Sequence, residues 1–78
     1  MLKFKLIGNN RETISYRYYP EGKDLWGEIA LRKENMEIIS QKVADGDEFK
    51  WYFWKMYRKI KEFVQQEEFP PEGIIAWY

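Results

Sequence analysis

The longest periodic pattern in the chain lies between Asp47 and Gln66 and predicts a helix. At 100° per residue, its apolar side chains fall on one broad stripe, as in a helix packed on a core. The stripe contains Phe49, Tyr52, Phe53, Met56, Ile60, Phe63 and Val64, with Tyr57 at its margin. Asp45 or Asp47 can cap the start, and Asp45 with Glu48 has capping-box spacing. We therefore expect the helix to begin near residues 46–48 and to end by Glu68, because Phe69 precedes proline.

Two shorter stretches before the helix alternate between apolar and polar positions, the period of a half-buried strand. In the first, Leu2, Phe4 and Leu6 alternate with lysines. Residues 8–10 then predict a turn, and residues 13–19 alternate again, with Ile14, Tyr16 and Tyr18 on one face. These two strands are expected to form a hairpin.

Two further strands follow a proline–glycine turn at residues 20–22. In residues 24–32 the alternation points Leu25, Ile29 and Leu31 inward, with Gly27 on the same side to leave room for a bulky neighbour from the helix. Residues 36–43 predict a fourth strand. Its facing stays open because two isoleucines, at positions 38 and 39, are adjacent.

The last five residues, 74–78, are apolar and predict a short fifth strand or a tail pinned to the core. The chain is thus expected to form one α+β domain over residues 1–78. Its predicted architecture is a four-stranded antiparallel sheet with one long helix packed on one face and a short C-terminal strand. Sequential strands usually lie beside each other, so the predicted sheet order is 1-2-3-4 with the fifth strand at an edge.

Two short motifs carry a resemblance to a known family. They are the Tyr-Tyr-Pro-Glu-Gly turn at residues 18–22 and the Pro-Glu-Gly…Ala-Trp-Tyr ending at residues 71–78. In these motifs the chain resembles a family of small uncharacterised bacterial proteins. The resemblance covers about a sixth of the chain; it implies a similar strand-rich fold and brings no activity or site residues with it.

The composition excludes much chemistry. The chain has 78 residues, 45% of them hydrophobic and 19% aromatic, which is enough for one small core. It contains no cysteine and no histidine, so the thiol nucleophile, the commonest general base and the usual zinc ligands are missing. No nucleotide-binding or hydrolase motif is present. We expect no metal, no cofactor and no catalytic residues. The lack of cysteine, of a leader and of a long apolar run favours a cytoplasmic protein that does not enter membranes.

Acidic residues give two weaker candidates for chemistry. Asp45 and Asp47 flank a glycine, but the ligand spacing of a calcium loop is missing and helix capping explains them. An enzyme that uses paired carboxylates is an alternative only if folding gathers Glu21, Glu67, Glu68 and Glu72 in a cleft.

One face of the predicted helix does not fit the usual division into an apolar and a charged side. Trp51 and Trp54 project opposite the core stripe, among basic residues. The whole chain has no net charge, yet residues 48–66 carry five basic and two acidic residues, a net of +3 that leaves −3 elsewhere. Tryptophan and arginine are the residues that dominate interface hot spots. We therefore expect a homodimer or a protein complex formed through Trp51, Trp54, Lys55, Arg58 and Lys61. In the alternative reading, the tail at Trp77 or Tyr78 folds over the two indoles.

Binding of single-stranded nucleic acid is a second interpretation, because basic side chains can meet phosphates while aromatic rings stack on bases. Two surfaces are candidates. One is the same helix face with Lys50 added. The other is the sheet face away from the helix, with Lys3, Lys5, Arg17, Tyr19 and Trp26. The zero net charge and the absence of an RNA-binding aromatic motif count against it.

Overall fold

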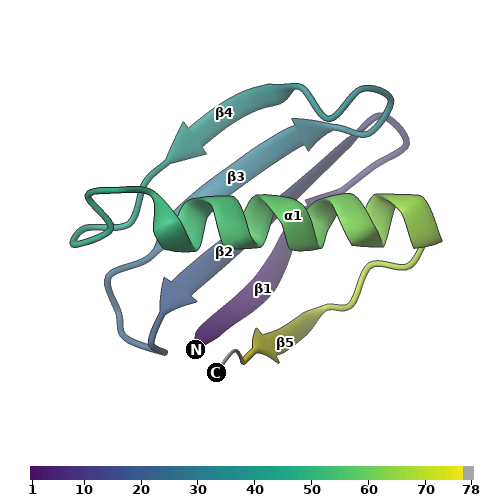
Figure 1. The fold of residues 1–78 in the computed structure, drawn as a ribbon. Coiled ribbons are helices and arrows are strands. Elements are labelled where there is room, and N and C mark those ends of the chain that lie inside the picture. Colours follow the sequence, from purple (N-terminus) through teal and green to yellow (C-terminus); the bar gives the residue numbers. More distant parts are fainter. Residues whose placement is uncertain (77–78) are drawn as a thin grey trace.

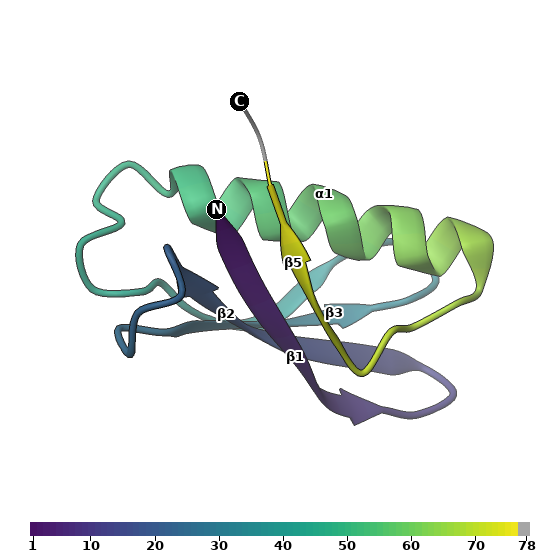
Figure 2. The same cartoon turned by 90° about the horizontal axis from the view of Figure 1, so that it is seen from below.

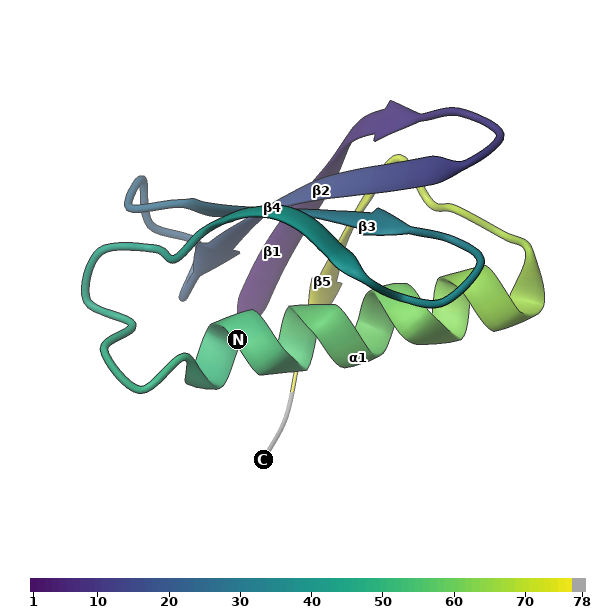
Figure 3. The ribbon, with the colours of Figure 1, turned by 90° about the horizontal axis from the view of Figure 1, so that it is seen from above.

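Residues 1–76 form an antiparallel five-stranded sheet with one helix lying across one face (Figure 1). This computed structural model describes residues 1–76. The elements in chain order are β1 (Leu2–Asn9), β2 (Thr13–Pro20), β3 (Gly27–Arg32), β4 (Ile38–Lys42), α1 (Trp51–Gln66) and β5 (Glu72–Ile75). The strand order is β4-β3-β2-β1-β5, so the predicted α+β class is confirmed, and the fifth strand joins the edge beside β1. Figure 2 and Figure 3 show the helix as a separate layer over the sheet.

The first hairpin forms as the alternation predicts. Leu2 and Phe4 of β1 are buried, as are Ile14, Tyr16 and Tyr18 of β2, while Lys3 and Lys5 of β1 are exposed. The predicted turn begins too early, because β1 continues through a bulge near Gly8 to Asn9. The reversal instead depends on Asn10, whose Oδ1 accepts hydrogen bonds from the backbone N–H groups of Glu12 and Thr13 at 2.9 and 2.8 Å.

The third and fourth strands are shorter than predicted. β3 begins at Gly27, and Leu25, which was expected to point inward, is exposed. Gly27 does face the core, but the ring that needs its space is Tyr18 of the neighbouring strand, not a helix side chain. β4 holds only residues 38–42. A register shift in its pairing leaves Ile38 half-buried and Ile39 exposed, which resolves the facing that the sequence left open.

The helix begins at Trp51, three residues or more after the predicted start. Asp47 is the cap, but from a distance: its Oδ1 accepts from the Tyr52 N–H at 3.2 Å and its Oδ2 from the Phe53 N–H at 3.0 Å. A turn at residues 47–50 makes this possible, and it places Lys50 in the left-handed region with φ of 56°. The predicted capping box of Asp45 and Glu48 is therefore wrong. Phe49 lies outside the helix and is 79% exposed, so its expected place in the core stripe is also wrong.

The helix ends where proline requires. Gln66 is its last residue and Glu67 is left-handed, with its N–H directed at the carbonyls of Phe63 and Val64. The chain then passes Pro70, whose carbonyl accepts a 2.8 Å hydrogen bond from the Tyr16 hydroxyl. β5 follows beside β1, with Leu2 opposite Ile75. The expected strand at residues 74–78 thus begins earlier, at Glu72, and Trp77 and Tyr78 lie outside the described residues.

Aromatic rings dominate the core between sheet and helix. The rings of Phe4, Tyr16 and Phe63 meet with centroids 5.5–5.6 Å apart, and Tyr18 meets Phe53 edge to face at 6.3 Å. Four of the predicted helix positions are buried: Phe53, Met56, Ile60 and Phe63. The core stripe of α1 is therefore confirmed apart from its first residue, and it fixes which side of the helix faces away from the sheet.

Candidate interaction surface

A row of exposed side chains runs along α1 on the side opposite the core. Its members follow one another at steps of three and four residues, so they share one face of the helix. We call this row the outer helix stripe; it consists of Trp51, Trp54, Arg58, Lys61 and Gln65, all of them exposed. Four of the five residues expected to bind a partner are thus brought together. The fifth, Lys55, lies at the edge of the stripe and is half-buried.

The two indoles of the stripe are accessible. Trp51 is 69% exposed and Trp54 is 43% exposed. Trp54 leans on the helix side chains next to it, edge to face with Phe53 at 5.0 Å and with Tyr57 at 5.4 Å between centroids. Its orientation is therefore set by the core. The alternative in which the tail covers these indoles concerns Trp77 and Tyr78, which lie beyond the described residues.

Phe49 adds a third aromatic ring that the sequence prediction had placed in the core. A shallow groove of about 290 Å³ is lined by Phe49, Lys50, Trp51, Trp54, Lys55 and Arg58. A second hollow, of about 340 Å³, shares Phe49 and Trp51 with this groove. The exposure of Phe49 follows from the late helix start, which depends on Asp47. The sequence held one signal for it, the availability of Asp47 as a cap.

The two cations of the outer helix stripe are not paired with any other side chain of residues 1–76. Across residues 1–76, Arg58 and Lys61 make no ion pair, hydrogen bond or cation–π contact with a side chain. Their neighbour Lys59 differs, because its Nζ lies 3.1 Å from the Glu62 carboxylate and 5.8 Å from the Phe63 ring centroid. Arg58 and Lys61 therefore offer charge beside exposed indoles with nothing in the described chain to neutralise it.

The outer sheet face collects the second set of candidate residues. Strand register places Lys5 opposite Arg17, Arg17 opposite Glu28, and Lys3 opposite Tyr19. The Trp26 ring has the Arg17 guanidinium carbon 3.9 Å from its centroid and the Lys42 Nζ at 3.7 Å. Two cations therefore already lie over this ring. This ring is not free to stack on a base, and Arg17 is held there although its buried Nε has no hydrogen-bond partner.

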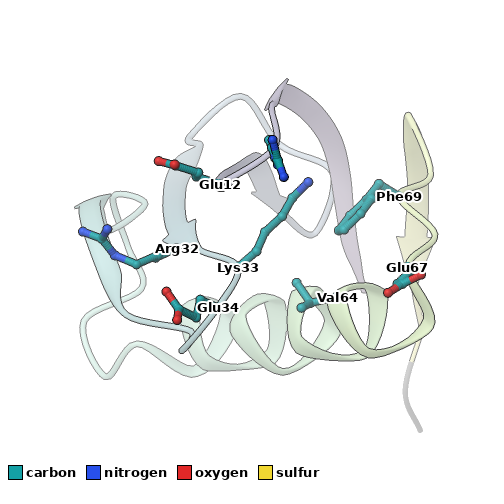
Figure 4. A pocket seen from close by; sticks show the side chains of 8 residues that line it. Glu12, Arg32, Lys33, Glu34, Val64, Glu67 and Phe69 are labelled. Carbon is teal, nitrogen blue, oxygen red and sulfur yellow. The ribbon is translucent and has the colours of Figure 1, made fainter.

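Another hollow lies between the strand turns and the C-terminal end of α1 (Figure 4). It encloses about 640 Å³ and its lining has three basic and three acidic residues: Arg11, Glu12, Arg32, Lys33, Glu34 and Glu67, together with Val64 and Phe69. Lys33 extends across it, and its Nζ donates 2.6 Å hydrogen bonds to Asn9 Oδ1 and the Asn10 carbonyl. The same Nζ is 4.6 Å from the Phe69 ring centroid. Because its central cation is already engaged and its charges balance, this hollow favours neither anions nor cations.

The carboxylates considered for catalysis have separate roles. Glu21 Oε2 accepts from the Met1 ammonium at 2.8 Å and from the Tyr52 hydroxyl at 2.7 Å, and the first of these bonds does most to lower the Glu21 pKa. Glu67 ends the helix and Glu72 begins β5. Within residues 1–76, no three acidic residues gather as a metal site, and no helix is long and apolar enough to cross a membrane.

Comparison with known proteins adds no external guide. The chain matches no protein-family model, no curated protein and no solved structure. The resemblance of residues 18–22 and 71–78 to a bacterial family therefore stays a prediction.

Proposed function

We propose that the protein is a non-enzymatic interaction module that binds a protein partner through the outer helix stripe. One observation carries the proposal: two exposed indoles lie on one helix face beside two cations that have no partner among the described residues. Tryptophan and arginine are enriched in interface hot spots. Tryptophan contributes because its large rigid ring can be buried at little entropic cost. The groove at Phe49 extends the apolar area of the same face.

The test compares two double variants that remove similar exposed apolar groups. The Trp51→Ser, Trp54→Ser variant removes the indoles. The Leu25→Ser, Ile74→Ser control removes exposed apolar side chains from other parts of the surface. Both variants should keep the far-ultraviolet circular dichroism of the wild type, because none of these four side chains belongs to the buried core.

The readout is retention of partners from an extract of the source cells on immobilised protein. We expect the wild type and the control to retain the same proteins and the indole variant to lose them. If all three proteins retain the same set, the stripe is not the binding surface. If the indole variant unfolds, the indoles are core residues and the proposal fails.

Single-stranded nucleic acid is the second candidate partner, favoured by the register that gathers Lys3, Lys5 and Arg17 on the outer sheet face. Such binding depends on phosphate contacts and weakens steeply between roughly 50 and 200 mM salt. On the helix face, Trp54→Ala should then cost about 1–3 kcal/mol of binding free energy through lost stacking. The two cations already over the Trp26 ring and the zero net charge count against this candidate. Absence of retention on mixed oligonucleotides at low salt would exclude it.

A further inference from the structure

We propose that the partner of the outer helix stripe is a second copy of the same chain, bound with the two α1 helices antiparallel about a two-fold axis that crosses the stripe at the level of position 56. In this arrangement Trp51 faces Lys61 of the second copy, and Trp54 faces Arg58 of the second copy. The inference rests on the proposed function, because it names the occupant of that surface. It follows from the spacing of the stripe and from the order of its residues.

The spacing is that of a helix–helix contact. From Trp51 the steps to Trp54, Arg58, Lys61 and Gln65 are three, four, three and four residues. This is the heptad pattern that keeps one row of side chains directed at a neighbouring helix over successive turns. All five side chains are exposed, so the row is available along the whole helix.

The order of the residues selects an antiparallel pair. In a parallel pair each residue of the row meets its own copy, so Arg58 would face Arg58 and Lys61 would face Lys61. Like charges brought together in a partly dry interface oppose binding. In an antiparallel pair the row runs in opposite directions, so the aromatic half of one helix lies on the cationic half of the other.

The same logic selects one register. In an antiparallel heptad pair, the first residue of a three-residue step on one helix faces the last residue of a three-residue step on the other. Trp51 is such a first residue and Lys61 such a last one. Trp51 can then face Lys61, with Trp54 opposite Arg58. A shift by one heptad in one direction puts Trp51 against Trp54 and leaves both cations outside the helical overlap. A shift in the other direction puts Arg58 against Lys61, which repel.

The selected register gives each indole a cation. The face of an indole is the best aromatic partner for an ammonium or guanidinium group, and the attraction grows when water is excluded. By symmetry the dimer holds four such contacts, two for each copy. None of the four cations has another side-chain partner within residues 1–76, so no existing ion pair has to break. The contact spans only about three helical turns, so it belongs to the weak, transient class of interfaces.

The decisive experiment is complementation between two defective variants. One variant, Trp51→Ser, Trp54→Ser, keeps the cations, and the other, Arg58→Ser, Lys61→Ser, keeps the indoles. Each variant alone has lost all four contacts, so both should self-associate at least about tenfold more weakly than the wild type. In a mixture, the indoles of one variant meet the cations of the other and two of the four contacts return. Sedimentation from micromolar to millimolar protein should therefore detect a mixed dimer where each variant alone is monomeric.

Three outcomes would overturn the inference. They are a wild type that stays monomeric to millimolar concentration, a cation variant that dimerises as tightly as the wild type, and a mixture that shows no mixed dimer. A monomeric wild type leaves the proposed function intact, because retention of another protein is measured separately. A Lys3→Ser, Lys5→Ser variant, which loses two cations from the sheet face, is the matched control and should dimerise like the wild type.

Disulfide cross-linking tests the register while Trp54 and Arg58, the central pair of the proposed contact, stay in place. The chain has no cysteine, so a Trp51→Cys, Lys61→Cys variant carries only these two thiols. They lie about 15 Å apart along one rigid helix and cannot pair within a chain. Oxidation should give a disulfide-linked dimer of this variant and not of Lys61→Cys alone. Equal cross-linking of both would contradict the register.

Discussion

The ring of Tyr18 occupies the space into which any side chain at position 27 would project. The two residues are paired across β2 and β3, and a Cβ atom added to Gly27 would collide with the phenol ring. Tyr18 cannot move away easily, because its hydroxyl oxygen accepts the Ala44 N–H at 3.1 Å and its ring packs on Phe53. The glycine is therefore required by a neighbouring strand.

Gly27→Ala should lower the free energy of unfolding by about 1–3 kcal/mol, the usual cost of forcing an extra methyl group into a packed core. A urea titration measures the loss. The Tyr18→Leu background should reduce it, since the shorter side chain frees the space. A Gly27→Ala variant as stable as the wild type would show that the ring has room to shift.

The core stripe of α1 predicts a second set of stability changes. Phe53 and Ile60 have no exposed surface, so Phe53→Ala or Ile60→Ala should cost about 2–5 kcal/mol through lost burial and a residual cavity. Gln65→Ala, on the opposite face, should change stability by less than about 0.5 kcal/mol. Denaturant melts compare the three. Equal effects at positions 53 and 65 would mean that the helix is rotated.

Asp47 caps the helix and Asp45 does not. Asp47→Ala removes the acceptors for the Tyr52 and Phe53 N–H groups and should cost about 1–2 kcal/mol. Asp45→Ala should be close to neutral, because Asp45 is exposed and makes no hydrogen bond in the described chain. Urea midpoints of the two variants test this. The reverse ranking would restore the capping box predicted from the sequence.

Glu21 gives the stability a defined dependence on pH. Hydrogen bonds from the Met1 ammonium and then from Tyr52 lower the pKa of Glu21 in the folded protein, so the folded state prefers the ionised carboxylate. This stabilisation is present above the ordinary glutamate pKa and is lost as the pH falls through the lowered value.

The stability gap between wild type and Glu21→Gln should therefore be largest near neutral pH and should shrink on acidification. Thermal melts at a series of pH values measure the gap. Glu34→Gln is the control, since the Glu34 carboxylate has no hydrogen bond in the described chain. A gap that stays constant down to acid pH would show that Glu21 acts through packing alone.

The local alternation of apolar and polar residues was enough to predict much of the fold. The buried side chains of β1 and β2 are those that the period of two selects, because a strand buried on one face needs little more than that pattern. The helix positions from Phe53 onward follow equally from the period of 3.6. These features depend on neighbours in sequence, so the sequence shows them.

The misplaced residues depend on contacts that span the fold. Phe49 lies outside the core because a turn separates it from the helix, and Asp47 caps the helix from the start of that turn. The turn needs Lys50 in the left-handed conformation, which lysine rarely adopts. Trp26 was a candidate for base stacking on the sheet face, but Lys42 of β4 lies over its ring. At the candidate surface, the sequence placed Trp51, Trp54, Arg58 and Lys61 on one face, since only helical spacing was needed. It could not show which cations were already engaged.

The pairing of Leu2 with Ile75 has a consequence for how the chain folds. It pairs residues far apart in the sequence, so this contact costs more chain entropy than the hairpin contacts if it forms before the helix has docked. The first four strands and the helix can assemble from nearer neighbours. During synthesis the outer edge of β1, with its unsatisfied backbone groups, therefore stays open until residues 72–75 have left the ribosome, and in that interval the nascent chain is most exposed to aggregation.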